Sequence, residues 1–201
     1  GMAVVLMLIL SAINMIGVKF MAETNKMIVF WKLVIPIAIA LVLIFYKPHF
    51  SNLTSEHGFA PNGLGGIFSS VSSGGIAMSF FGFQTAIFLA GESKNPQKAI
   101  PYSLFGSILF CIVLYVALQI GFILALDPSN IQNGWSSIAF KGDAGPFAGI
   151  FIALGMVFMV WLLYFDAVLS PFGTAIGYVA SSSRILYSLS LQGDAPKFLS
   201  K

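Results

Sequence analysis

The chain has 201 residues, of which 58% are hydrophobic and only 8% are charged, and its mean hydropathy is +0.92. Water-soluble domains carry about a quarter charged residues, so this composition excludes a soluble protein and indicates an integral membrane protein. The net charge of +3 is too small to suggest a nucleic-acid partner. With one cysteine, Cys111, and no CxxC pair or ligand-spaced histidines, the sequence predicts no disulfide within the chain, no metal site and no other cofactor.

Apolar runs of the length that crosses a bilayer follow one another along the chain. About 20 apolar residues span a hydrocarbon core of about 30 Å. The expected helices cover residues 3–18, 27–46, 64–90, 100–126 and 155–189, with a short interfacial helix at 147–154. The first run starts almost at residue 1 without a charged flank, so we interpret it as a helix that lacks its beginning rather than as a signal peptide. A polar turn at 19–26 should separate it from the second run.

The last apolar region, residues 147–189, is too long for one crossing, and two topologies compete for it. A turn at Ser170–Gly173 would make a hairpin, whereas an interfacial helix before one long helix would make a single crossing. Cytoplasmic loops carry an excess of Lys and Arg, and only the single crossing obeys this rule. It places Lys19, Lys26, Lys94, Lys98, Arg184, Lys197 and Lys201 inside, and Lys47 and Lys141 outside. We therefore predict an all-α, multi-pass protein of the cell membrane, with five transmembrane helices in one membrane region (1–201) and a cytoplasmic carboxy terminus.

Apart from Arg184 near the end of the fifth run, two charged residues, Lys32 and Asp166, lie inside apolar runs, where the bilayer makes a charge expensive. Asp166 is near the middle of the fifth run, where a charge costs about 3 kcal/mol and usually faces a cavity or an opposite charge. A structural alternative exists for each residue, because Lys32 could snorkel to the interface and Asp166 could be neutral and hydrogen-bonded. We expect instead that both face one water-accessible space. A desolvated lysine there could bind and release a proton near neutral pH, which predicts proton coupling.

The third run is interrupted in a way that a uniform lipid-facing helix is not. Serines and glycines weaken its first half, and the segment SFFGFQ, residues 79–84, occupies its centre. Glycines in membrane helices often serve only close helix packing. A break would instead expose main-chain N–H and C=O groups at mid-membrane, which is tolerated where they line a cavity. Such groups suit the ammonium and carboxylate of a small zwitterion, so we predict a discontinuous helix that carries a binding site.

A second candidate break lies in the fifth run, at Ser170-Pro171-Phe172-Gly173-Thr174. Pro171 removes one main-chain hydrogen bond of the helix. The hydroxyls of Ser170 and Thr174 lie four residues apart and therefore on one face. The alternative is a plain proline kink.

Three stretches resemble the amino acid, polyamine and organocation (APC) superfamily of secondary transporters. They read NMIGVK from Asn14, SFFGFQ from Ser79 followed by AGESKNP from Ala90, and SRILY from Ser183. In that family they correspond to the junction of helices four and five, to helix six with the loop after it, and to the end of helix eight. The resemblance thus implies helices four to eight of a twelve-helix fold built from inverted repeats.

The resemblance also implies roles for single residues. The amino group of the substrate would meet free carbonyls at the break in the sixth helix, at Ala77, Met78, Phe80 and Phe81, with Gly82 beginning the second half-helix. Lys32 matches a lysine that replaces a sodium ion in proton-coupled or sodium-independent members, and Ser170 and Thr174 fall near it. Gln84, in the same substrate site, stands where many members carry glutamate, which leaves proton coupling more dependent on Lys32. Asp166 is not part of the common pattern.

The leading hypothesis is a portion of an amino acid permease that works by alternating access, either proton-coupled or exchanging. The alternative is a truncated membrane scaffold or regulatory subunit without transport activity. An enzyme ranks third, because the polar residues inside the runs lack an adjacent histidine or a metal set. The expected partners are an amino acid, the lipid bilayer, the missing helices of the permease and, if transport is coupled, protons. Asn52-Leu53-Thr54 also matches a glycosylation acceptor on the outer side.

Overall fold

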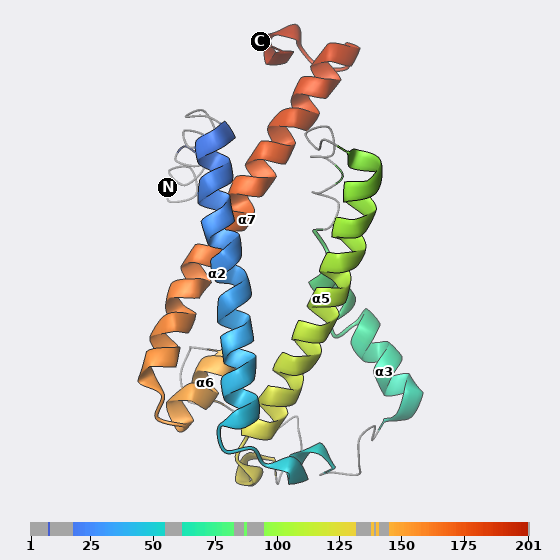
Figure 1. Ribbon diagram of the computed structural model, residues 1–201. Coiled ribbons are helices and arrows are strands. Elements are labelled where there is room, and N and C mark those ends of the chain that lie inside the picture. The colour runs from blue at the N-terminus through green and yellow to red at the C-terminus, as the bar shows by residue number, and fades with distance from the viewer. Residues whose placement is uncertain are drawn as a thin grey trace. The chain divides into compact units, whose positions relative to one another are not determined.

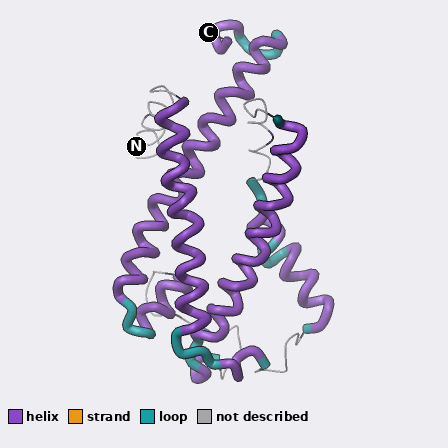
Figure 2. The backbone as a smooth tube through the Cα atoms, in the orientation of Figure 1, coloured by secondary structure: helices purple, strands orange, loops and turns teal. Residues whose placement is uncertain are grey.

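The computed structural model describes residues 8, 18–54, 62–82, 87, 95–131, 138, 140 and 145–200. Its α-helices are α2 (Val18–Phe45), α3 (Gly63–Ser72), α5 (Pro96–Ala125), α6 (Gly145–Ala153) and α7 (Val157–Gln192), as Figure 1 shows. Its 3-10 helices are η1 (Phe50–Leu53), η2 (Ala77–Phe80), η4 (Pro128–Asn130) and η6 (Lys197–Ser200). Over the described residues all regular structure is helical (Figure 2), which confirms the all-α prediction.

Three of the described helices are long and apolar enough to cross a bilayer. They are Glu23–Phe45 within α2, the whole of α5 and the whole of α7. In contrast, α3 has only 10 residues and reaches about 15 Å, half of the hydrocarbon core. Many large apolar side chains of the three long helices are exposed within this chain, as expected of surfaces that lipid or further membrane helices cover. The expected first helix, 3–18, lies outside the described residues except at its residues 8 and 18.

The helix α2 begins earlier than the sequence predicts. The segment 19–26, expected as a polar turn, is helical, and the helix continues to Phe45. Charged side chains do not end a helix by themselves, whereas glycine and proline do, and neither occurs between Val18 and Pro36. The expectation of a turn was therefore wrong: the polar residues lie on the same helix as the apolar run that follows them.

The last apolar region divides at Gly155 and not at Ser170–Gly173. Directly after α6, the N–H of Met156 donates to the carbonyl of Phe151 at 2.8 Å, and Gly155 between them has a φ of +73°. Glycine adopts this left-handed conformation without strain, so it ends the helix here. The helix α7 then continues through Pro171 without interruption. The region therefore contains a short helix and one long helix rather than a hairpin.

The chain forms two compact units. Unit 1 comprises Gly1–Lys32, Gly82–Gly106 and Ala167–Lys201, and unit 2 comprises Leu33–Phe81 and Ser107–Asp166. In unit 1 the first part of α2 packs against the second part of α7. Ile28 and Ile176 are buried at the centre of this contact, and they are surrounded by Leu169, Phe172, Ala175 and Val179.

In unit 2 the second part of α2 packs against the second part of α5. Leu43 of α2 is completely buried, and a Cβ built on Gly121 of α5 would lie 3.0 Å from its Cβ. Because glycine has no side chain, the two helix backbones can approach closely at this point. Leu126 after α5 and Phe151 of α6 are the other large side chains buried most deeply.

A buried polar residue of unit 2 caps the carboxy end of α5. Asn52 in η1 is 3% exposed, and its Nδ2 donates to the carbonyls of Ile123 at 2.9 Å and Leu126 at 2.8 Å. The last carbonyls of a helix lack partners within the helix, and this amide supplies a donor to two carbonyls at the end of α5. Asn52 also belongs to the triplet that matches a glycosylation acceptor, but in the folded chain its side-chain nitrogen is buried and hydrogen-bonded.

Candidate functional site

The third apolar run is broken on both sides of η2, as the sequence predicts. The helix α3 ends at Ser72, and Gly75 in the turn that follows has a φ of +82°. After the four residues of η2, Phe81 is extended, with a ψ of 154°. A positive φ and an extended residue each stop an α-helical ladder of hydrogen bonds. The main chain around η2 therefore departs from the regular helix that the apolar pattern alone would suggest.

The hydrogen bonds of η2 are those of a tight turn. The N–H of Ser79 is shared between the carbonyls of Gly75 and Ile76, both at 3.1 Å, and the hydroxyl of Ser79 also donates to the Gly75 carbonyl at 3.2 Å. The N–H of Phe81 donates to the carbonyl of Met78 at 3.1 Å. Phe81 then leaves the helical path, so the regular helical hydrogen-bond pattern ends at the last carbonyls of η2. Groups of this kind can meet a cationic ligand inside a membrane.

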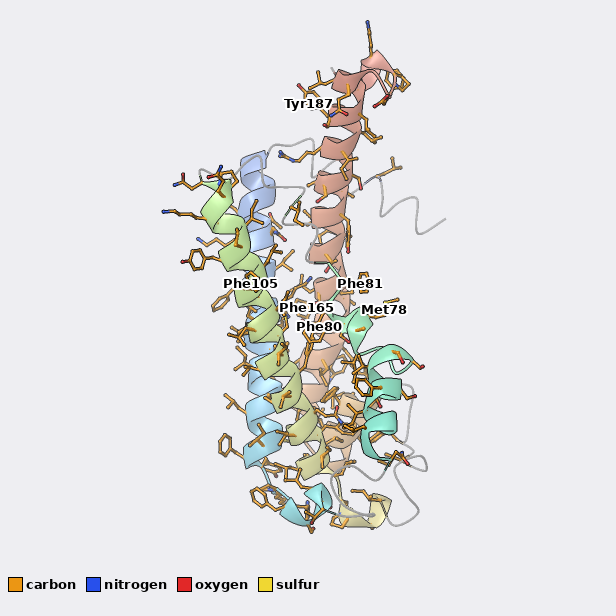
Figure 3. All side chains as sticks on the ribbon, turned by 90° about the vertical axis from the view of Figure 1, so that its right-hand side faces the viewer. Met78, Phe80, Phe81, Phe105, Phe165 and Tyr187 are labelled. Atoms are coloured by element: carbon orange, nitrogen blue, oxygen red, sulfur yellow. The ribbon has the colours of Figure 1, made fainter. Side chains whose placement is uncertain are left out.

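Most of the predicted substrate residues lie on or beside η2. Met78 and Phe81 are 68% and 66% exposed, whereas Phe80 is half-buried. In Figure 3, Phe80 lies on the side of η2 nearer to α5, and Met78 lies on the far side. Ala77 is exposed at the start of η2, and Gly82 after it has a φ of +111°, which glycine adopts without strain. The sixth predicted residue, glutamine 84, lies outside the described residues.

Tyr115 of α5 contacts η2, and the sequence analysis missed it. Its hydroxyl donates to the main-chain carbonyl of Ser79, 36 residues earlier, at 3.2 Å. Its ring packs edge-on against Phe80, with 5.4 Å between the ring centroids. One signal was available, because a tyrosine in a long apolar run needs a partner for its hydroxyl. The sequence could not show which residue that partner is.

In unit 1, Lys32 and Thr174 are directly bonded. The ammonium of Lys32 donates to the hydroxyl of Thr174 at 2.6 Å, and this hydroxyl donates to the main-chain carbonyl of Ser170 at 3.2 Å. The structure thus joins three of the four residues predicted for proton coupling, with Ser170 contributing its carbonyl. A hydroxyl can accept from an ammonium or donate to a neutral amine, so Thr174 can bond Lys32 in either protonation state.

Close packing of α2 on α7 brings Lys32 to this position. Ile28 lies one turn before Lys32 and hence on the same face of α2. A Cβ at Gly173 would overlap the Cγ2 of Ile28, so the helices could not pack as they do with any larger residue at 173. Gly173, which the sequence analysis placed in a candidate break, instead allows α2 and α7 to pack closely.

The fourth residue predicted for proton coupling, Asp166, is half-buried in the part of α7 that belongs to unit 2. Lys32 belongs to unit 1, where its hydrogen-bonded neighbour is Thr174. The expectation that Lys32 and Asp166 share one water-accessible space stays a prediction.

A cavity of about 700 Å³ lies elsewhere in unit 2 and has none of the predicted site residues in its lining. Its polar lining residues are Lys47, His49 and Asp127. The carboxylate of Asp127 accepts from the hydroxyl of Ser129 at 2.6 Å and from its N–H at 2.9 Å, and these bonds lower the pKa of Asp127. Volume alone does not identify a binding site, so we retain η2 as the candidate. The described residues contain no cluster of side chains suited to a metal ion.

Comparison with known proteins places these features in a family. A family model described as "Amino acid permease" matches residues 1–201. The glutamate/serine transporter AimA of Bacillus subtilis strain 168 is 40% identical over 99% of this chain and 36% of its own length. The aspartate-proton symporter of the same strain is 35% identical over 90% of this chain and 34% of its own length. The branched-chain amino acid permease BcaP of that strain is 27% identical over 99% of this chain and 40% of its own length. No solved structure matches the chain significantly.

The chain spans between 34% and 40% of the length of these three relatives. Each of them is named as a transporter, a symporter or a permease of amino acids. The family match covers every residue of the chain, and it agrees with the three bilayer-length helices and the interrupted third run. The chain is therefore part of a multi-pass membrane architecture and belongs to the amino acid permease family of the APC superfamily.

Proposed function

We propose that this chain forms part of a secondary active transporter of amino acids that works by alternating access, with further helices of the same permease completing the site. The observation that carries the proposal is the interruption of the third run on both sides of η2. A main chain that leaves the helical path inside a bilayer needs a compensating partner, and the ammonium of an amino acid is a suitable one. Family membership supports the same function.

The names of the relatives favour small polar or acidic amino acids as the substrates of this chain. The relative that is 40% identical is named for glutamate and serine, and the one that is 35% identical is named for aspartate. A third, at 27% identity, is named for branched-chain amino acids. The carbonyls of η2 would bind the α-ammonium, which all amino acids share. Met78 and Phe81 offer no charge to an acidic side chain. The charge of glutamate or aspartate would therefore be matched outside η2.

The second part of the proposal is that transport is coupled to protons and that Lys32 is the residue that binds and releases the proton. Its bond to Thr174 gives the amine a hydroxyl partner that can serve either protonation state. One relative is named a proton symporter, which supports this coupling. Binding and release of a proton by Lys32 would then change how α2 and α7 are held together in unit 1.

The test is uptake by the full-length protein in proteoliposomes, with labelled L-glutamate, L-serine, L-aspartate and L-leucine, with and without an acid-outside pH gradient. We expect saturable uptake of at least one of them and stimulation by the gradient. In Lys32→Ala the stimulation should be lost. Lys26→Ala is the matched control, because Lys26 is exposed on the same helix. Absence of saturable uptake for all four amino acids would contradict transport, and unchanged stimulation in Lys32→Ala would remove Lys32 from the mechanism.

The orientation in the membrane also belongs to the proposal. The charge distribution supports a cytoplasmic carboxy terminus, since it puts most Lys and Arg residues inside. In a cysteine-free background, Lys47→Cys should react with a membrane-impermeant maleimide on intact cells, and Asp194→Cys should react only after the cells are opened. The reverse pattern would invert the topology.

A further inference from the structure

Tyr115 of α5 contacts two consecutive residues of η2, Ser79 and Phe80. Its hydroxyl bonds the carbonyl of Ser79, and its ring contacts Phe80. The residues that flank this pair, Met78 and Phe81, are both exposed. In Figure 3, Met78 lies on the side of η2 away from α5. One side of η2 is therefore fixed by α5, and another is open.

We infer that Tyr115 is a positioning residue for substrate binding at η2, an inference that rests on the proposed function. It acts through Ser79 and Phe80 and need not touch the substrate.

The hydrogen bond fixes a whole peptide unit rather than a single atom. A peptide bond is planar, so the Ser79 carbonyl and the Phe80 N–H turn together. Holding this plane restricts the torsions on either side of it, and with them the directions of the neighbouring carbonyls of Met78 and Phe80. The N–H and hydroxyl of Ser79 are bonded to the preceding turn, so the residue is held at both ends.

The hydrogen bond from Tyr115 also distinguishes the Ser79 carbonyl, which it occupies, from the neighbouring carbonyls proposed to bind the substrate. The Ser79 carbonyl accepts from the hydroxyl of Tyr115, a hydrogen bond that lipid could not supply. In this proposal the substrate ammonium meets the carbonyls of Ala77, Met78, Phe80 and Phe81. The Met78 carbonyl also accepts from the N–H of Phe81, which is compatible with a second donor because a carbonyl oxygen has two lone pairs. The directions of these carbonyls are set before the substrate arrives, so the substrate need not order them, and its affinity is higher for that reason.

The test uses the full-length protein in nanodiscs and equilibrium binding of labelled L-glutamate and L-serine. In Tyr115→Phe, which keeps the ring and removes the hydroxyl, we expect the Kd to rise about three- to tenfold, the effect of one neutral hydrogen bond. Amide hydrogen exchange across residues 77–82 should become faster, and the stimulation of uptake by a pH gradient should keep its wild-type ratio. Tyr102→Phe is the matched control, because Tyr102 lies on the same helix and is 81% exposed.

A Kd in Tyr115→Phe within twofold of the wild-type value would overturn the inference while the proposed function stands. Fewer binding sites at an unchanged Kd would show a folding role only, and would overturn it too. Wild-type protein that binds no amino acid would overturn the proposed function and the inference together. If Tyr115→Phe does not fold, Phe80→Leu removes the ring contact and leaves the hydroxyl bond, and it should weaken binding with the same faster exchange across η2.

Discussion

The ammonium of Lys32 lies 2.6 Å from the hydroxyl of Thr174, a residue 142 positions later in the chain. The bond joins α2 to α7 within unit 1 and extends through the same hydroxyl to the main-chain carbonyl of Ser170. A hydrogen bond to a charged group is worth about 1.5–3 kcal/mol, more than a neutral one. Its loss should therefore be measurable in any process that depends on the position of Lys32.

Thr174→Val removes the hydroxyl and keeps the shape of the side chain. We expect it to reduce gradient-driven uptake by the full-length protein about tenfold or more, the effect of losing about 1.5 kcal/mol or more, because the ammonium loses the hydroxyl of Thr174 as an acceptor. Thr174→Ser should keep most of the activity. Ser170→Ala should also be active, since the chain of bonds uses the carbonyl of residue 170 and not its hydroxyl. Equal uptake by Thr174→Val and wild type would show that this bond is not used in coupling.

Gly173 sets the distance between α2 and α7, and a methyl group there should separate them. Gly173→Ala would place a Cβ against Ile28, so we expect a loss of about 1–3 kcal/mol in stability, the usual effect of overpacking. A thermal melt of the detergent-solubilised full-length protein measures this loss. Gly177→Ala is the control, because a Cβ at Gly177 would meet nothing within 4 Å.

The double variant Gly173→Ala with Ile28→Ala tests whether the clash is the cause. Removing the side chain of Ile28 should make room for the new methyl group, so the double variant should be more stable than the sum of the two single losses predicts. Strict additivity would mean that residues 28 and 173 are not in contact in the membrane.

The long helices could be predicted from the sequence because bilayer thickness sets their length and composition. Boundaries depend on different information. The start of α2 was misjudged because the polar residues at 19–26 were interpreted as the end of a helix, although neither glycine nor proline occurs between Val18 and Pro36. The division between α6 and α7 depends on the left-handed conformation of Gly155. Because the neighbours of Gly155 are apolar, the mean hydropathy of the region does not reveal this boundary.

The candidate site could be predicted in part for a related reason. The break near η2 follows from local composition, since serines and glycines weaken the helix over a few residues. The partners of the site are set by contacts between distant segments, and residue types alone do not specify these. Tyr115 on Ser79, and Thr174 as the acceptor for Lys32, are both contacts of this kind.

The pKa of Asp127 yields a prediction about pH. Bonds from the hydroxyl and the N–H of Ser129 lower this pKa, so the folded chain favours the carboxylate. The stabilising effect of such a group is fully present above the ordinary aspartate pKa of about 4, and it is lost as the pH falls through the lower folded value. The amide resonance of Ser129, followed by NMR, should therefore shift with a midpoint below about 4. A midpoint at or above that value would contradict the bonds, and Asp127→Asn should abolish the shift.

The two bonds from Asn52 to the end of α5 yield a prediction about stability. Asn52→Ala leaves the carbonyls of Ile123 and Leu126 without this donor, at an expected loss of about 1–3 kcal/mol. The loss should appear as a lower thermal midpoint of the full-length protein. The effect should be larger than for exposed polar residues of the same loop, because Asn52 is 3% exposed and water cannot easily replace the amide.

Thr54→Ala separates this cap from the role that the Asn-Leu-Thr triplet would otherwise suggest. It destroys the glycosylation acceptor but leaves both bonds of Asn52 in place, and Thr54 is exposed. We therefore expect Thr54→Ala to melt like the wild type while Asn52→Ala melts at a lower temperature. If both variants lost stability equally in a glycosylating host, the sugar would be responsible. If neither did, the two carbonyls must find water in place of the amide, and the carboxy end of α5 must be more open than the buried amide of Asn52 indicates.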